Sequence, residues 1–442
     1  MRVVSRFLNT LVERYLPSAF MFALLLTLIT VVLGMALGGQ SPMDMAGHWY
    51  AGFWNFLEFS MQMVVVLVTG YALAKAPVVD RALVSLASRP RTQLGALITT
   101  MVIAAGLGFI SWGLGFVGGT LIAIEIARQV RHADFRLLVA AAYTAVIATQ
   151  PISLALTAPL LVNTPGHSLE EKIGLIPVEE TLFSPTMIAC AVLGFIGVLV
   201  AFILMAPKGA DVVPYTGESE ATHDPAPATE RTPADRVNDS KIINGVIVVL
   251  GLAAMIGYFA AKGFNLELNV INFIFLITGM ALHGGPEKYA RCLTDGIPAA
   301  SGIVLQFPFY AGIIGMMAGA GLIVTVGEWF ASISSPGTFP LFTYVAAMLV
   351  NIFVPSAGGQ WQVMGPVMIE ASTALGVAPA TVVNAVSVGD MTTNLLQPFF
   401  VLPALGLSRL GLKDIWGYCL TAMVVLIVIC GGVFLLVPVL GW

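Results

Sequence analysis

Long apolar segments recur along the whole chain and limit the folds that it can adopt. Runs such as 20–37, 64–74, 188–206 and 423–437 each fit within about 20 residues, the length of a helix that crosses a bilayer. Hydrophobic residues make up 58% of the chain and charged residues 10%. A soluble domain contains about 25% charged residues, so this chain could not cover a water-exposed surface. The sequence therefore predicts an all-α polytopic membrane protein.

The apolar pattern predicts about nine transmembrane helices and two further segments that each contain a helix, a break and a second helix. These two segments, 92–127 and 338–371, are rich in glycine and polar residues at their centres. We interpret both as re-entrant hairpins, although each could instead be two full spans, and glycine and proline are common in membrane helices in general. The predicted spans are 16–38, 51–74, 137–160, 185–206, 242–261, 269–284, 296–320, 381–405 and 416–440.

A similar series of residues occurs twice, with 244 to 247 positions between matching members. The matching pairs are Gln62 with Gln306, Ser85 with Ser332, Ser111 with Ser356, Glu125 with Glu370, and Gln150 with Gln397. A duplicated membrane unit whose helices break at matched places is typical of alternating-access transporters. The pattern predicts a first repeat at 16–206 and a second, inverted repeat at 262–442, with 242–261 as the connecting span.

The positions of lysine and arginine predict the orientation, because these residues concentrate in short cytoplasmic loops. With a cytoplasmic N-terminus, 18 of the 20 fall on the cytoplasmic side, and only Lys172 and Lys262 fall outside. Arginines bracket the first broken segment, whereas the stretch between Arg291 and Arg409 that contains the second has neither lysine nor arginine. We therefore expect the two hairpins to open to opposite sides of the membrane.

Two segments outside the spans have a different character. Residues 207–241 contain several prolines and interspersed charges but little apolar surface, which predicts a flexible cytoplasmic linker. Residues 1–15 have apolar side chains on one helical face and arginines mostly elsewhere, which predicts an interfacial amphipathic helix. The cysteines and histidines show no metal-ligand spacing, so no metal centre is predicted.

The candidate substrate site lies at four predicted breaks: the two hairpin tips, and the prolines Pro151 and Pro398, which interrupt the spans 137–160 and 381–405. Helix N-termini at a break attract an anion, and glycines let a ligand approach the backbone. No lysine or arginine lies in a span near the breaks, so we expect a small monocarboxylate rather than a highly charged anion. The candidate substrate-binding residues are Ser111, Gly113, Gly115, Thr149, Gln150, Asn351, Ser356, Gly358, Gly359 and Gln397.

An acidic residue within a membrane segment is a functional candidate by default, and Asp390 lies in a polar stretch next to the last break. It could bind Na⁺ or carry the proton of a symporter, or it could cap the half-helix that follows. The candidate residues for the coupling ion are Asp390, Thr392, Thr393 and Asn394. No other cofactor is predicted.

Three segments resemble the bacterial short-chain fatty acid transporter family, and the resemblance extends over nearly the whole chain. These segments are Gln306-Phe307-Pro308-Phe309-Tyr310, 351–360 and Gly389-Asp390-Met391-Thr392-Thr393-Asn394. The resemblance implies a multi-pass permease of the bacterial inner membrane that takes up short-chain carboxylates such as butyrate and acetoacetate by cation or proton symport. The implied partners are the carboxylate and the lipid bilayer, with no nucleic acid.

More distantly, the chain looks like the wider ion-transporter group that includes sodium-coupled dicarboxylate carriers. Members of that group work as dimers, which implies a homodimer here, and carry Ser-Asn-Thr at their hairpin tips. The tips here read Ser111-Trp112-Gly113 and Ser356-Ala357-Gly358 instead. Sodium ligands are therefore not carried over from that group.

Two other functions stay open. A passive channel or uniporter for small monocarboxylates would show no stimulation by an ion gradient beyond the membrane potential. An intramembrane enzyme would need a nucleophile with a base in reach, and no histidine lies close in sequence to the serines at the breaks. We therefore expect a secondary active transporter and not an enzyme.

Overall fold

The computed structural model describes residues 19–207, 209–217, 232–352, 354, 356–396 and 398–442, and within these ranges it is helical, with no β-strand. Seven helical segments of this described part are long and apolar enough to cross a membrane. The prediction of an all-α, multi-pass membrane protein is confirmed, whereas the number of nine spans plus two hairpins stays a prediction. The amphipathic helix predicted at 1–15 lies outside the described residues.

The first half of the chain runs from α2 to α11, and a 3₁₀ turn at Gln150–Ile152 separates α8 from α9. Its helices are α2 (Ala19–Ala36), α3 (Pro42–Gly52), α4 (Leu57–Ala74), α5 (Pro77–Ala87), α6 (Gln93–Ile110), α7 (Trp112–Gln129), α8 (Phe135–Thr149), α9 (Thr157–Val162), α10 (Glu170–Ile173) and α11 (Pro185–Met205).

The second half runs from α12 to α22, and 3₁₀ turns at Ile297–Ala300 and Asn394–Leu396 precede α16 and α21. Its helices are α12 (Pro233–Asn238), α13 (Lys241–Lys262), α14 (Leu268–His283), α15 (Pro286–Gly296), α16 (Ser301–Gly319), α17 (Leu322–Ser332), α18 (Phe339–Asn351), α19 (Ala357–Leu375), α20 (Pro379–Thr393), α21 (Pro398–Ser408) and α22 (Leu412–Leu440). Both halves thus contain a long helix, a short helix, two helices that meet at a tight turn, and a helix interrupted by a 3₁₀ turn.

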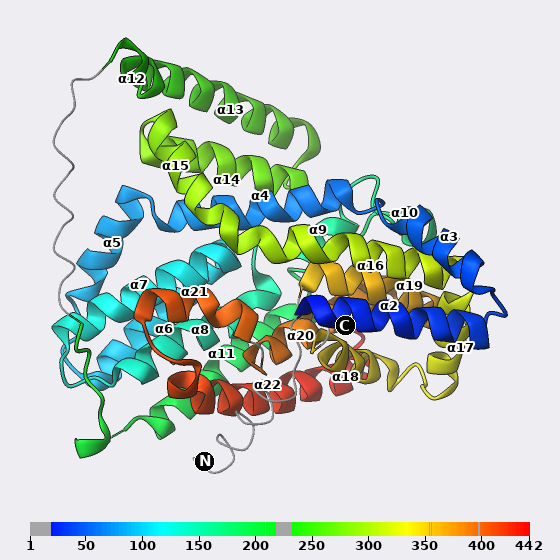
Figure 1. Ribbon diagram of the computed structural model, residues 1–442. Helices are drawn as coiled ribbons and strands as arrows, with labels where there is room; N and C mark the ends of the chain where they lie inside the picture. Colours follow the sequence, from blue (N-terminus) through cyan, green and yellow to red (C-terminus); the bar gives the residue numbers. More distant parts are fainter. Residues whose placement is uncertain (1–18, 208, 218–231, 353, 355, 397) are drawn as a thin grey trace.

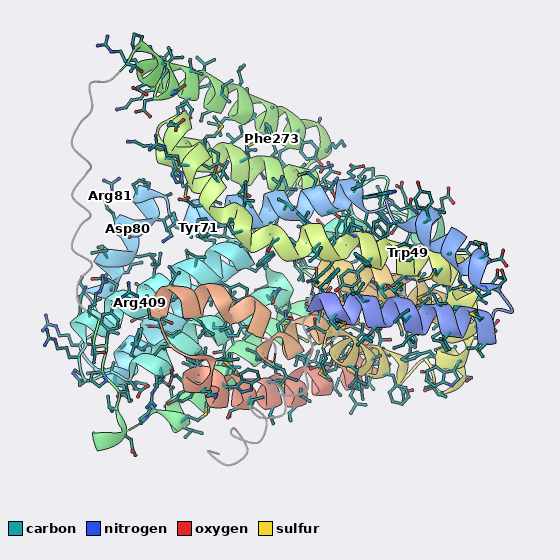
Figure 2. All side chains as sticks on the ribbon, in the orientation of Figure 1. Trp49, Tyr71, Asp80, Arg81, Phe273 and Arg409 are labelled. Carbon is teal, nitrogen blue, oxygen red and sulfur yellow. The ribbon has the colours of Figure 1, made fainter. Side chains whose placement is uncertain are left out.

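Two pairs of helices therefore meet at the turns that the sequence predicts as hairpin tips. Only Ser111 separates α6 from α7, and residues 352–356 separate α18 from α19. The first pair packs against α8, and the second against α20. In Figure 1, α5, α6 and α7 lie at the left of the molecule, and α17, α18 and α19 lie toward the right. Arg81 and Arg409, both predicted to be cytoplasmic, lie at the left as well (Figure 2).

The helices differ sharply in how much of their surface the protein covers. In α8 every residue except Arg136 is buried. Of the most apolar 18 residues in the segment Phe135–Val162, which begins with this helix, 83% are buried inside the protein. In the segment Pro233–Lys262, which contains α13, only 11% of the most apolar residues are buried, so α13 presents its apolar side chains outward. Since such a surface is stable only in lipid, α8 belongs to the core and α13 to the lipid-facing periphery.

Part of the segment predicted as a flexible linker is fixed in the structure. The backbone N–H of Val213 donates to Asp134 Oδ2 at 2.8 Å, and the Val213 carbonyl accepts from the N–H of Phe135 at 2.8 Å. The ring of Tyr215 packs edge-on against Phe135, with centroids 4.8 Å apart. Residues 209–217 are therefore a strap bound to the start of α8, which the low apolar content of 207–241 as a whole did not reveal.

Close packing of α6 on α7 generates a first prediction, at Gly115. A Cβ atom at this position would lie 2.6 Å from the Cα atom and 2.8 Å from the N atom of Gly108, both rigid backbone atoms. We expect Gly115→Ala to destabilise the protein by about 1–3 kcal/mol, the usual cost of overpacking. Gly106→Ala is the matched control, because a Cβ at Gly106 in α6 meets nothing within 4 Å. Thermal unfolding in detergent measures both, and equal melting temperatures for the two variants would contradict the prediction.

Candidate functional site

A cavity of about 430 Å³ lies between α4, the start of α7, the 3₁₀ turn after α8, the start of α16 and the start of α19. Four of the predicted substrate-binding residues line it, from α7, the 3₁₀ turn after α8, and the start of α19. They are Gly113, Gln150, Ser356 and Gly358. The structure therefore brings together residues that are up to 245 positions apart in the sequence. Among the described lining residues none is charged.

At the first tip, Ser111 connects α6 to α7 in an extended conformation, with φ −157° and ψ 131°. Its side chain is fully buried, and its Oγ atom has no hydrogen-bond partner among the described residues. The adjacent Gly113 faces α4, because a Cβ there would lie 3.7 Å from the Leu67 carbonyl oxygen. Ser111 thus lies beside the cavity wall, and Gly113 forms part of it.

At the second tip, Ser356 also has an extended conformation, with φ −161° and ψ 114°. Its Oγ atom accepts a hydrogen bond from the N–H of Gly359 at 3.3 Å and so caps α19. A Cβ at Gly358 would overlap the ring of Phe59 and lie 2.9 Å from Thr157 Cγ2. Glycine at position 358 therefore lets α19 begin directly against the first half of the chain.

The walls between the tips combine amide groups with aromatic rings. Gln150 is buried, and its Oε1 atom has no hydrogen-bond partner within the described ranges. Gln306 lines the cavity from α16, and its Oε1 atom accepts from the hydroxyl of Tyr310 at 3.1 Å. The aromatic lining residues are Tyr71, Trp112, Phe116 and Phe307. The cavity is thus mostly apolar with a few hydrogen-bonding groups, which is typical of a small-molecule site.

A second, fully buried polar cluster lies where α18 ends and α20 is interrupted. The side-chain NH2 group of Asn351, with two hydrogens to donate, lies within hydrogen-bond distance of three acceptors: the carbonyl of Asp390 at 2.6 Å, Thr393 Oγ1 at 3.0 Å and Asn394 Oδ1 at 2.8 Å. Asn394 in turn donates to Asp390 Oδ2 at 3.4 Å. The hydroxyl of Thr392 lies 3.2 Å from that of Tyr344. All four candidate residues for a coupling ion are therefore neighbours.

The Asp390 carboxyl group is the unusual member of this cluster. Its side chain is fully buried, and its Oδ1 atom has no hydrogen-bond partner among the described residues. None of the salt bridges found in the described part of the chain includes it. An ionised carboxylate that is buried with one long hydrogen bond, from Asn394, and no salt bridge is strongly unfavourable. The group therefore needs either a proton or a cation in this conformation.

The other predicted site residues have contacts that do not involve the cavity. The Thr149 hydroxyl donates to the carbonyl of Ala145 at 2.9 Å, within its own helix. Gly115 packs on Gly108, and a Cβ at Gly359 would lie 3.2 Å from the ring of Tyr310. Asn351 belongs to the second cluster. Gln397 lies outside the described residues.

Several lining residues were not among the predicted site residues. Gln306 is a member of the repeated series, but neither it nor the aromatic residues Trp112, Phe116 and Phe307 was among the candidate site residues. The wall from Pro298 to Ile303, and Tyr71 in α4, were not recognised. The one available signal was Pro298, which lies in the 3₁₀ turn that interrupts the chain before α16.

Comparison with known proteins adds a family. The family model described as "Short chain fatty acid transporter" matches residues 1–437. A protein of Escherichia coli (strain K12) named "Putative short-chain fatty acid transporter" is 39% identical over 425 residues, which cover 95% of this chain and 96% of that protein. A protein of Haemophilus influenzae with the same name is 36% identical over 431 residues, with the same coverage.

Two solved structures share the fold at low sequence identity. The YdaH transporter of Alcanivorax borkumensis superimposes with a TM-score of 0.64 at 18% identity, covering 96% of this chain and 99% of that one. MtrF of Neisseria gonorrhoeae, described with a class of antimetabolite efflux pumps, gives a TM-score of 0.55 at 15% identity, covering 98% and 97%. Both similarities extend over almost the whole chain.

The buried side-chain amide of Asn351 generates a second prediction. We expect Asn351→Ala to destabilise the protein by about 1–3 kcal/mol, because the buried acceptors Thr393 Oγ1 and Asn394 Oδ1 lose this donor, whereas the carbonyl of Asp390 still accepts from the backbone N–H of Asn394. Asn269→Ala is the control, since Asn269 is exposed and pairs only with Gln62 in the described part of the chain. Thermal unfolding in detergent compares the two, and a smaller loss for Asn351→Ala than for Asn269→Ala would contradict the assignment.

Proposed function

The chain belongs to the short-chain fatty acid transporter family, and we propose that it moves monocarboxylates such as butyrate and acetoacetate across the bacterial inner membrane by secondary active transport. The family and both relatives are named as transporters, so the predictions of transport and of a chain that is not an enzyme are confirmed. The substrate, the coupling ion and the binding residues are our proposals.

The cavity between the two tips supports a monocarboxylate as the substrate. The helices α7 and α19 both begin at its wall, with Gly113 and Gly358 in their first turns. The first N–H groups of a helix have no acceptor within that helix and carry partial positive charge, so both N-termini favour an anion. With no cationic side chain among the described lining residues, these groups and the amides suit one negative charge. Trp112, Phe116 and Phe307 would contact the alkyl chain.

The buried Asp390 supports coupling to a cation, and our proposal of a symporter rather than a passive uniporter depends on this residue. Its neighbours Thr392, Thr393 and Asn394 supply further oxygen atoms, which suit Na⁺, while a proton would need the carboxyl group alone. Asn351 links this cluster to the substrate cavity. It is the last residue of α18, and α19, the other helix of the pair, begins at the cavity wall. Occupancy of the ion site would therefore fix the position of the second tip.

We also propose the arrangement in the membrane that the sequence predicts. The two halves would be inverted repeats, with 92–127 and 338–371 as re-entrant hairpins and a cytoplasmic N-terminus. The matching order of elements in the two halves and the position of the two helix pairs toward opposite ends support this arrangement (Figure 1). A homodimer is implied only by the resemblance to the wider ion-transporter group.

Uptake into proteoliposomes tests the function directly. We expect saturable uptake of labelled butyrate and acetoacetate that is stimulated by an inward gradient of either Na⁺ or H⁺, after subtraction of uptake by protein-free vesicles. Asp390→Asn should remove this stimulation, because an amide neither carries the proton nor supplies the charge for Na⁺. The control is Glu328→Gln, the same chemical change at an exposed residue of α17.

The outcomes separate the candidate functions. Saturable uptake that ignores both gradients would indicate a uniporter and leave Asp390 with a structural role. Protein-dependent uptake of neither acid would remove the proposed substrates, but would leave the family and the fold unchanged. Gradient-stimulated uptake by Asp390→Asn would place the coupling site elsewhere.

The two matched glutamines offer an electrostatic test of the cavity. Gln306→Glu keeps the shape of the side chain and the oxygen that accepts from Tyr310, but places a negative charge at the cavity wall. We expect the KM for butyrate to rise roughly ten-fold or more, equivalent to about 1.4 kcal/mol of repulsion. Gln62→Glu is the control, because Gln62 does not line the cavity and donates to Asn269 at 2.9 Å. An unchanged KM for Gln306→Glu would place the carboxylate elsewhere.

A further inference from the structure

A groove of about 760 Å³ lies apart from the substrate cavity and shares no lining residue with it. It lies between the start of α6, the turn from α7 to α8, the end of α11 and the strap that follows α11. We propose that this groove binds an anionic phospholipid of the bilayer, with the phosphate at Arg131 and His132 and the acyl chains along α6 and α11.

The apolar side of the groove continues into the lipid-facing surface of the protein. On α6, the exposed side chains of Leu94, Ile98 and Val102 recur every four residues, and so they share one face of the helix. On α11, Ile196, Val200 and Ile203 do the same at intervals of four and three residues. The two helices contact one another. Leu94 and Ile203 are the members that line the groove, so acyl chains could extend from the groove along both stripes.

The polar side of the groove carries positive charge. Arg131 and His132 are exposed at its edge, and no acidic residue is among the described residues that line it. The acids nearest in sequence pair with other arginines, Glu125 with Arg128 at 3.1 Å and Asp134 with Arg136 at 3.2 Å. None of the salt bridges in the described ranges includes Arg131. A guanidinium group suits a phosphate, since it can donate two parallel hydrogen bonds to two of its oxygens.

The position of the groove relative to the apolar segments fits the headgroup region of a bilayer. The apolar helix α6 begins at Gln93, and α11 ends at Met205, so the groove lies where both candidate spans end. The phosphates of a bilayer lie just outside its hydrocarbon core. Basic pockets between membrane helices at this depth are suited to acidic lipid headgroups.

The groove is also built into the fold rather than left by a loose loop. One wall consists of Pro207 and residues of the strap 209–217. The amide of Gln93 donates to the carbonyl of Pro207 at 2.9 Å, and Asp134 and Phe135 hold Val213 as described above. These bonds keep the wall opposite Arg131 in place without an occupant.

Native mass spectrometry of the purified protein tests the proposal without any variant. The protein in detergent is given equal amounts of phosphatidylglycerol and phosphatidylcholine with identical acyl chains. We expect roughly five-fold more bound phosphatidylglycerol, the factor that corresponds to about 1 kcal/mol for one cationic residue near an anionic lipid. Equal binding of the two lipids would overturn the proposal.

Variants then locate the bound lipid. The double variant Arg131→Gln with His132→Gln should bring the two lipids close to equal binding. The control, Arg89→Gln with Arg91→Gln, removes two arginines that precede α6 and do not line the groove, and should keep the preference. Loss of the preference in the control alone would place the lipid elsewhere. Glycerol phosphate, added as the free headgroup, should not displace the lipid, and displacement at equal concentration would show a site for a soluble phosphate instead.

Discussion

Every interruption of a helix inside a membrane needs partners for the backbone groups that it frees, and this constraint determines how the centre of the protein is built. At the first break, the hydroxyl of Ser153 donates to the carbonyl of Gly108 at 2.7 Å, and the N–H of Leu154 donates to that of Phe109 at 2.7 Å. At the second break, Asn351 donates to the carbonyl of Asp390. In the first half the end of α6 is thus hydrogen-bonded to the segment that follows α8, and in the second half the end of α18 is hydrogen-bonded to α20. These bonds hold each tip near the cavity.

The two halves solve the same structural problem with different chemistry. In the first half, the hydroxyls of Thr144 and Thr149 donate to carbonyls within their own helix, at 2.9 Å each. In the second half, Thr393 Oγ1 bonds outside its helix, to the carbonyl of Met348 at 3.1 Å, and Asp390 adds a carboxyl group. Tyr143 of α8 donates to the carbonyl of Asn394 at 2.8 Å and so connects the first half to the second break. This difference is the reason why we propose a coupling site only in the second half.

Positions of breaks could be predicted from the sequence, but the uses of individual residues at those breaks could not. Proline at position 151 and the series Ser111-Trp112-Gly113 mark where helices end, because proline lacks an N–H and glycine tolerates turns. Glycine is equally useful where a ligand or another helix approaches. The sequence therefore could not distinguish Gly113, at the cavity wall, from Gly115, which packs on Gly108. Similarly, only the fold shows that the Thr149 hydroxyl donates a hydrogen bond within its own helix and that Gln306 lines the cavity.

The polar contacts of the second helix pair, α18 and α19, differ in the free energy that is lost when each is broken. Near α10, Lys172 pairs with Glu370 of α19 at 3.0 Å, with side chains 52% and 33% exposed, and Ser168 donates to Gln362 at 2.7 Å. An exposed ion pair contributes about 0–1 kcal/mol, whereas a buried polar group that loses its partner costs about 1–3 kcal/mol. Of these contacts, the Lys172–Glu370 ion pair is therefore the weakest. Loss of the Ser168 bond would leave the buried Gln362 without this partner, just as loss of the Asn351 amide would leave buried acceptors without their donor.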